Sequence, residues 1–235
     1  KISRAAHEPD GAGGGYHDEE VDMDVKTLGR LFSVRRYYFD RKWQMDDLSQ
    51  RIEFNYAGEK LDSVTLAGAT LTRTATENEI QPGEKLHDSD GDMLECLTNG
   101  YRMTWAGGEW ARYDANGRRL AKGDRQGRQI QYGYDGNADR VVAIYDHYTN
   151  QILWIEYASA GWVTRIRDRA IGGRSVSYDY DGAGRLTNVV GVLGGTMTYR
   201  YDSNGRLIHK TAPGGYERFI TYQANGTVAS VLDGE

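Results

Sequence analysis

Acidic residues at a regular spacing are the first feature of this sequence that could support chemistry. Asp88, Asp90 and Asp92 alternate along a polar stretch, and carboxylates spaced in this way are the ligands of a calcium loop. Such a loop needs a glycine after its third acid, but Gly91 precedes that acid, and the twelfth position of the loop is Asn99. The full pattern fails, and a solvated hairpin turn is the favoured interpretation.

Nucleophilic and metal-binding residues are sparse. Cys96 is the single cysteine, so an internal disulfide framework is excluded. Its neighbours Leu94 and Leu97 favour a small buried residue over a nucleophile. No Gly-x-Ser-x-Gly elbow, P-loop or dinucleotide fingerprint occurs, and no pair of histidines has metal-ligand spacing. The sequence therefore predicts no catalytic residue, no metal and no cofactor.

Aspartate and arginine recur together, and two interpretations of them stay open. The favoured one is structural, with each pair stabilising a turn or bonding neighbouring repeats. The other is a polar surface that binds glycans, on which exposed aromatic rings stack against sugars. The residues that would supply those rings are Trp43, Trp105, Trp110, Trp154 and Trp162.

These pairs belong to a motif, Tyr-Asp-x-x-Gly-Arg-Leu, whose anchor tyrosines fall at 113, 134, 157, 180, 201 and 222. The spacings are 21, 23, 23, 21 and 21 residues, and a nearly fixed period of this size indicates an array of one supersecondary unit. A repeated residue is more simply explained by stacking than by a catalytic site. The positions interpreted as structural are Tyr113, Asp114, Gly117, Arg118, Tyr134, Asp135, Arg140, Tyr157, Gly161, Tyr180, Asp181, Gly184, Arg185, Leu186, Tyr201, Asp202, Gly205, Arg206, Leu207, Tyr222 and Gly226.

Each unit is expected to be a β-hairpin. Residues two and four positions before an anchor tyrosine share its face of the strand, as Val176 and Tyr178 do before Tyr180, and the positions between are mostly polar. Asp-x-x-Gly supplies the turn. The return strand carries apolar residues three apart, such as Leu186 and Val189, which predicts a bulge or bend in each return strand. Bent hairpins side by side would curl the sheet.

Three segments are expected along the chain. Residues 1–20 are glycine-rich and polar, and predict a flexible lead-in. Residues 21–50 are irregular, consistent with a short helix or with strands, the latter favoured, in an atypical N-terminal capping segment. Residues 51–235 are the repeat array, in which the stretch from His87 to Leu94 is a decayed copy. The fold class is thus all-β, an array of antiparallel hairpins.

Composition removes several classes of partner. The net charge is −5, and the 29 basic and 34 acidic residues are interspersed, so there is no footprint for nucleic acid. No apolar run approaches the ~18 residues of a membrane span, so membrane insertion is not expected.

From about Arg51 to Leu232, and most closely from Tyr113 onward, the chain resembles the RHS/YD-repeat family. The repeat at Tyr157 departs from the pattern by lacking Asp and Arg, and the one at Tyr222 lacks both charged positions. The resemblance implies a spiralling sheet that winds into a hollow shell. Bacterial members are large exported proteins, among them polymorphic toxins, type VI secretion effectors and insecticidal toxin complexes, and their shells enclose a C-terminal toxin domain; teneurins carry animal versions.

On that resemblance, we expect a non-catalytic scaffold of a secreted or cell-surface bacterial protein. Its partners would be the rest of the parent chain and the domain it encloses or presents. The paired Asp-Pro signals of a family autoprotease are lacking, so neither that protease nor a toxin domain is expected in these residues. Two alternatives remain: an adhesin that binds carbohydrate or another cell-surface partner, and a glycan-active β-solenoid enzyme, which rests only on the β-rich repeat.

Overall fold

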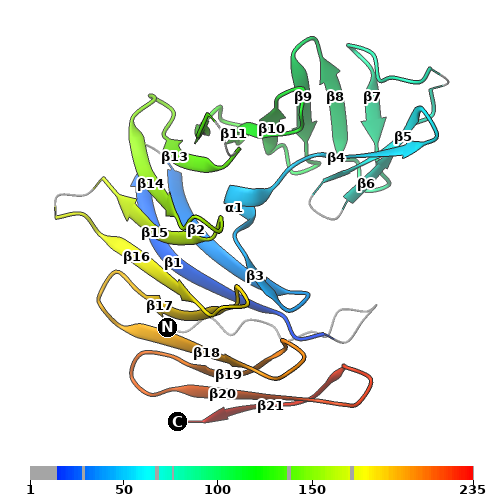
Figure 1. The fold of residues 1–235 in the computed structure, drawn as a ribbon. Coiled ribbons are helices and arrows are strands. Elements are labelled where there is room, and N and C mark those ends of the chain that lie inside the picture. Colours follow the sequence, from blue (N-terminus) through cyan, green and yellow to red (C-terminus); the bar gives the residue numbers. More distant parts are fainter. Residues whose placement is uncertain are drawn as a thin grey trace. The chain divides into compact units, whose positions relative to one another are not determined.

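The computed structural model describes residues 15–27, 30–66, 69–75, 77–136, 139–169 and 172–234, and these are almost entirely β-structure (Figure 1). The four-residue helix α1 (Asp46–Ser49) is far too short to cross a bilayer, and no other helix in these ranges could do so. The early strands are β1 (Asp18–Thr27), β2 (Arg30–Phe39), β3 (Lys42–Gln44), β4 (Glu53–Ala57), β5 (Lys60–Leu66), β6 (Ala69–Thr72), β7 (Lys85–His87), β8 (Met93–Leu97), β9 (Gly100–Thr104) and β10 (Trp110–Tyr113). The later strands are β11 (Arg119–Gly123), β12 (Gln129–Tyr134), β13 (Val141–Tyr145), β14 (Gln151–Tyr157), β15 (Val163–Asp168), β16 (Ser175–Tyr180), β17 (Leu186–Val190), β18 (Thr196–Tyr201), β19 (Leu207–Thr211), β20 (Glu217–Tyr222) and β21 (Val228–Gly234).

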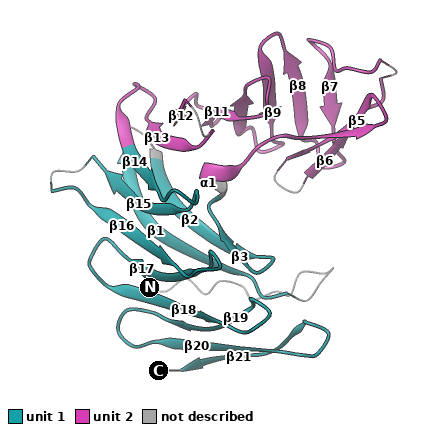
Figure 2. Cartoon of the chain, in the orientation of Figure 1, with its two compact units in different colours: residues 1–26, 31–47, 153–235 teal, residues 27–30, 48–152 magenta. Residues whose placement is uncertain are grey.

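Two compact units divide the chain (Figure 2). Unit 1 comprises residues 1–26, 31–47 and 153–235, and unit 2 comprises 27–30 and 48–152. Within unit 2, antiparallel pairing follows chain order from β4 against β5 to β12 against β13, and within unit 1 from β14 against β15 to β20 against β21. The sheet is not closed.

Unit 2 is a hairpin array curled around its own core. Its buried side chains come from successive strands and include Leu61, Leu71, Leu94 and Met103, each at most 1% exposed. The curl brings the segment before β4 to the turn between β10 and β11, where an isolated bridge pairs Arg51 with Arg118. A single sheet can bury one face in this way without a second layer.

In unit 1, strands β14 to β21 form regular hairpins with the predicted bulges. Tyr180 pairs with Leu186 while Asp179 pairs with Asn188, so Thr187 is left as the extra residue of the return strand. The bulge turns residues three apart to the same face, which is why Leu186 and Val189 are both buried. The same shift occurs at the other anchor tyrosines of this unit, so the bulge prediction is confirmed.

A separate three-stranded sheet, β1-β2-β3, covers one face of the C-terminal hairpins of unit 1. Arg36 of β2 hydrogen-bonds Tyr199 of β18, and the Tyr38 hydroxyl accepts the N–H of Leu207 on β19. Residues 21–50 therefore include the strands that were favoured as well as the short helix α1, and β1–β3 lie on the face of the hairpins β16 to β19. Their inward side chains need an apolar partner, and these hairpins supply it.

The expected flexible lead-in, residues 1–20, is described by the structure only in part. Residues 1–14 lie outside the described residues. The remainder, 15–20, enters the sheet, because β1 begins at Asp18 and the Tyr16 side chain is 3% exposed. Burial of Tyr16 against Tyr38 and Arg218 outweighs the glycine-rich composition around it.

Candidate functional site

The aspartate of the motif organises the turn. At Asp181, Oδ1 accepts the backbone N–H groups of Ala183 and Arg185, both at 2.9 Å, and Oδ2 accepts Nε of Arg185 at 2.7 Å. Gly184 has φ +79° and donates its N–H to the Asp181 carbonyl at 2.9 Å. Only glycine adopts this left-handed conformation without strain. The Arg185 hydrogen bond, followed by the backbone donors, lowers the pKa of the Asp181 carboxyl below its usual range.

The arginine of one repeat also reaches the anchor tyrosine of the next. The Arg185 guanidinium lies 5.3 Å from the ring centroid of Tyr201, and the Tyr201 hydroxyl donates to the Leu186 carbonyl at 2.7 Å. A cation–π contact at a partly exposed site contributes about 0.5–1 kcal/mol. A hydrogen bond contributes a net ~0.5–1.5 kcal/mol. Both contacts recur in two other repeats. Arg118 lies over the ring of Tyr134, whose hydroxyl donates to the Arg119 carbonyl. Arg206 lies over the ring of Tyr222, whose hydroxyl donates to the Leu207 carbonyl.

In the repeat anchored by Tyr157, a tryptophan occupies the place of the arginine. Trp162 stands at the arginine position of the repeat anchored by Tyr157, and its ring lies 5.4 Å from that of the next anchor, Tyr180. The turn persists, since the Ala158 N–H donates to the Trp162 carbonyl at 2.8 Å. The Trp162 ring also covers Gly184, where an added Cβ would lie 2.5 Å from it. Apolar stacking thus takes the place of the ionic contact.

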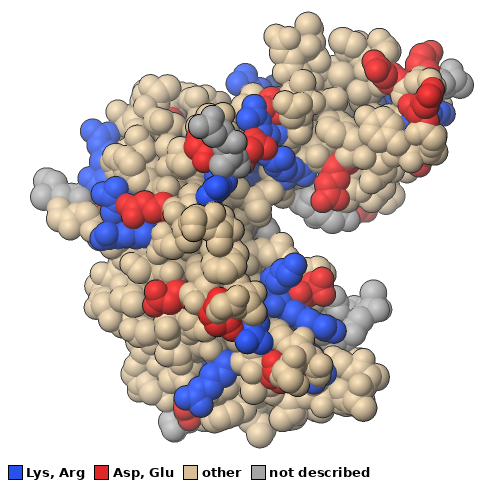
Figure 3. Space-filling model, viewed as in Figure 1, with Lys and Arg blue, Asp and Glu red and all other residues tan. Residues whose placement is uncertain are grey.

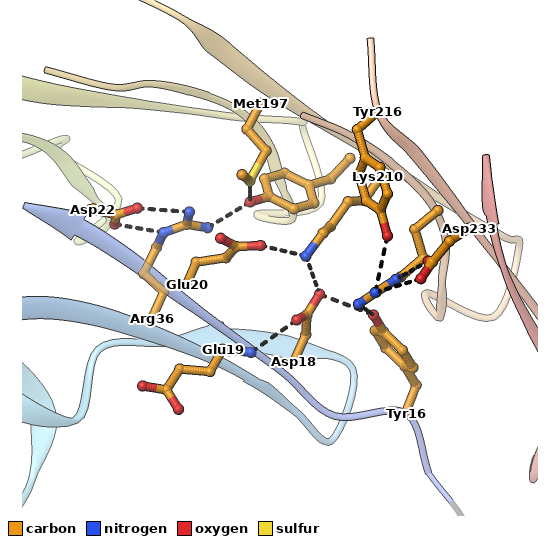
Figure 4. Close-up of polar contacts among 12 residues, drawn as sticks. Tyr16, Asp18, Glu19, Glu20, Asp22, Arg36, Met197, Lys210, Tyr216 and Asp233 are labelled. Carbon is orange, nitrogen blue, oxygen red and sulfur yellow. Dashed lines mark hydrogen bonds and ion pairs between the residues drawn. The ribbon is translucent and has the colours of Figure 1, made fainter. Parts of the chain in front are cut away.

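A second group of polar contacts lies between β1–β3 and the hairpins (Figure 4). We call it the buried ionic layer and define it as Asp18, Glu20, Asp22, Arg36 and Lys210. Arg36, 1% exposed, donates to both carboxylate oxygens of Asp22 at 2.6 and 2.8 Å. Lys210 contacts Oδ2 of Asp18 at 2.6 Å and also pairs with Glu20.

Aromatic rings enclose the Arg36 part of the layer. The guanidinium lies 4.8 Å from the Trp43 ring centroid and 5.6 Å from that of Tyr199. The Tyr178 hydroxyl donates to Asp22 at 2.8 Å. Burial, with the Asp22 carboxylate next, holds the pKa of Tyr178 well above its usual range, so this hydroxyl remains a donor. The arrangement is a buried polar network that joins the two sheets.

Residues 157–196 match the family model described as RHS Repeat, and they span two of the hairpins built in this way. These residues are therefore an RHS repeat. A comparison with curated proteins finds no match.

Several solved structures are similar to this RHS-repeat chain. One is the Tc holotoxin pore of Photorhabdus luminescens, at 20% identity over 72% of this chain and 10% of that chain, with a TM-score of 0.43. Another is TcdB2-TccC3-TEV, at 17% identity over 88% of this chain and 10% of that chain, with a TM-score of 0.41. A porin-like protein from Bacteroides uniformis has 11% identity over 92% and 93% of the two chains, and a TM-score of 0.38. The chain spans about a tenth of these two toxin chains, and the function proposed below rests on its own contacts.

The five tryptophans considered for glycan binding are all half-buried in the RHS-repeat chain. Trp105 packs on the core of unit 2, and Trp110 donates its indole N–H to a backbone carbonyl at 3.2 Å. Trp154 lies beside an arginine and Trp43 beside two tyrosines. Trp162 has the intra-array role described above. Glycan binding by these residues stays a prediction.

The other residues considered for chemistry, the three aspartates of the possible calcium loop and Cys96, have structural roles. Oδ1 of Asp88 accepts the backbone N–H groups of Asp90 and Asp92, and Asp92 accepts that of Ala106, so these carboxylates act as turn acceptors. Among the described residues, no group of three or more His, Cys, Asp or Glu side chains is placed to hold a metal ion. Cys96 is buried, and burial raises the pKa of its thiol.

Two sets of RHS-repeat contacts escaped the sequence analysis. Asp124 with Arg128 and Asp168 with Arg174 form the same carboxylate–guanidinium turn. They lie midway between anchors, at the hairpin connections, and neither aspartate follows a tyrosine. Asp-x-x-Gly-Arg alone, without the tyrosine, would have found the first. The buried ionic layer left one signal: Lys210 stands where most of the other return strands carry an apolar residue.

Proposed function

We propose that this chain is a wall segment of an exported RHS-repeat protein. It acts as a structural scaffold, without catalysis of its own, for a shell that encloses or presents a toxin or other effector domain. Its partners would be the rest of the parent chain and that domain, in a secreted or cell-surface protein.

The observation that carries this proposal is that the polar side chains of the motif are all engaged in contacts within the array. Asp181 is engaged by the turn, Arg185 by Asp181 and Tyr201, and the Tyr201 hydroxyl by a carbonyl of the preceding return strand. Each of these groups therefore bonds its own turn or a neighbouring repeat. Such nearest-neighbour coupling is what an extended wall of stacked units needs.

A protease-protection experiment on the natural full-length product tests the proposal. The product is digested under native conditions, and the domain that accompanies this segment is followed by mass spectrometry, with the same domain alone as the control. We expect the domain to survive within the product and to be digested when alone. Combined Arg185→Gln and Arg206→Gln, which loosen two successive repeat contacts, should increase its cleavage.

Equal digestion of the domain in both settings, or a natural product with no further domain, would contradict the shell proposal. Catalysis by the purified chain on a peptide, glycan or nucleic acid, lost on one substitution, would contradict the scaffold assignment. The adhesin alternative predicts glycan-array binding that Trp162→Ala removes while the fold persists. The half-buried position of all five tryptophans gives it no particular support.

A further inference from the structure

Lys210 of β19 and two acidic side chains of β1 meet in the buried ionic layer. The Lys210, Asp18 and Glu20 side chains are only 7%, 3% and 18% exposed. Lys210 Nζ lies 2.6 Å from Asp18 Oδ2 and contacts Oε1 of Glu20 (Figure 4). An amine thus touches two carboxyl groups in a site that water scarcely reaches.

The lysine occupies a position that is apolar in several other repeats. Three residues after the start of the return strands β13, β15 and β17 stand Ile144, Ile166 and Val189, all buried, and Lys210 takes the equivalent place after Leu207. The repeat anchored by Tyr113 also has a lysine, Lys122, at this place. Burying an amine costs free energy that an apolar residue at the same place would not. Its presence opposite two acids therefore points to a role that an apolar side chain could not fill.

We propose that Lys210 and Asp18 form an intramolecular isopeptide bond, with Glu20 as the acid–base group. Glu20 accepts a proton from Nζ, and the neutral amine attacks Cγ of Asp18, so that a C–N bond forms. A carboxyl C–O bond then breaks, and its oxygen leaves as water, with the two protons that Nζ loses delivered through Glu20. The ammonium and the carboxylate become one amide and one water, with no change in oxidation state and no co-reactant.

The Asp18 carboxyl is held for such an attack. Its Oδ1 accepts the Glu19 N–H at 3.0 Å, and its Oδ2 accepts the Tyr16 hydroxyl at 3.0 Å. Fixed donors on a carboxyl polarise it and stabilise the negative charge that develops on its oxygens as the amine adds. Burial, then the Asp18 carboxylate, raises the pKa of Tyr16, so its hydroxyl keeps the proton that it donates.

The fold also holds the two reacting groups, Lys210 and Asp18, next to each other. Residues 18 and 210 are 192 positions apart, and the fold itself brings them together. Holding an amine beside a carboxyl carbon makes the condensation intramolecular, which removes the entropic cost of an encounter. The bond would fix β1 permanently to β19.

Mass spectrometry of the folded chain tests this inference. We expect an intact mass one water below that of the sequence. A tryptic digest should contain a branched peptide joining residues 5–26 to residues 207–218, uncleaved after Lys210 because its amine is acylated. Lys210→Arg keeps the charge but cannot condense, and it should restore the full mass. Glu20→Gln keeps both reacting groups, and it should slow or abolish the mass loss.

The control is Lys85→Arg, which alters an exposed lysine paired with Glu95 and should leave the missing water unchanged. Full sequence mass in the folded wild-type chain after prolonged incubation would overturn the inference. So would a missing water that the digest places elsewhere, for example as a succinimide at Asp181-Gly182. The branched peptide is sought in the wild-type chain, so the result holds even if a variant fails to fold. The outcome is also independent of the proposed shell function.

Discussion

Two glycines with the same backbone conformation should respond very differently to a methyl group. Gly184 and Gly205 end successive motif turns, with φ of +79° and +78°. A Cβ on Gly205 would meet no atom within 4 Å, whereas a Cβ on Gly184 would lie 2.5 Å from the Trp162 ring. Gly205→Ala therefore measures the backbone strain alone, and Gly184→Ala measures the strain plus the clash.

The expected magnitudes follow from these two effects. Left-handed backbone costs a non-glycine residue roughly 1–2 kcal/mol. Overpacking against a ring that cannot move freely adds about 1–3 kcal/mol. The Trp162 ring is not free to move, because it stacks on Tyr180. We expect a loss of ~1–2 kcal/mol in the free energy of unfolding for Gly205→Ala, and ~2–5 kcal/mol for Gly184→Ala.

Urea unfolding of the two variants and of Trp162→Ala, alone and combined with Gly184→Ala, provides the measurement. The combined variant should be destabilised by less than the sum of the single ones, by the ~1–3 kcal/mol of the clash. Equal losses for Gly184→Ala and Gly205→Ala, or strict additivity in the cycle, would refute the placement of Trp162 on this turn. Comparison is restricted to variants that keep the same m-value.

Three further predictions follow from other contacts. Tyr201→Phe removes the bond to the Leu186 carbonyl and should cost ~0.5–1.5 kcal/mol in urea unfolding, whereas Tyr148→Phe, at an exposed ring, should cost almost nothing. The turn aspartates have lowered pKa values in the folded chain, so the stability they contribute is present above about pH 4 and is lost as pH falls further; a urea midpoint constant from pH 5 to pH 2 would contradict this. Arg36→Met leaves Asp22 buried without its ionic partner and should cost ~3–5 kcal/mol, with early loss of hydrogen-exchange protection in β1 and β2; unchanged protection there would disprove the role of this pair.

The repeat hairpins could be predicted because their determinants are local. Leu186 and Val189 stand three apart on one strand, and only a bulge can turn both inward, so the sequence already implies the register shift that the structure contains. The sequence left open whether recurring arginines such as Arg185 stabilise a turn or bond neighbouring repeats. Arg185 does both, because one planar guanidinium can pair with a carboxylate and still lie over a ring.

The location of β1–β3 could not be predicted, because nothing local specifies it. Arg36 meets Tyr199 from 163 positions away, and their sequence neighbourhoods share no motif. Two adjacent arginines in an apolar run, such as Arg35 and Arg36, indicate a solvent-exposed face unless a buried partner is known. Lys210 was the available clue, because a charge at a position that is apolar in most of the other repeats needs an opposite charge from another segment when it is buried.

The docked sheet changes what the proposed wall presents in unit 1. The face of β16 to β19 that carries Tyr178 and Tyr199 is already occupied by β1–β3, so an enclosed domain cannot rest on it there. Such a domain would instead meet the opposite face of β1–β3. That face exposes Val21, Leu31 and Phe39 at 48%, 53% and 49%, beside charged residues such as Arg35 and Glu19. Basic and acidic side chains are also interspersed on the face drawn in Figure 3. A lining of scattered apolar and paired charged groups offers such a domain many weak contacts and no single strong one.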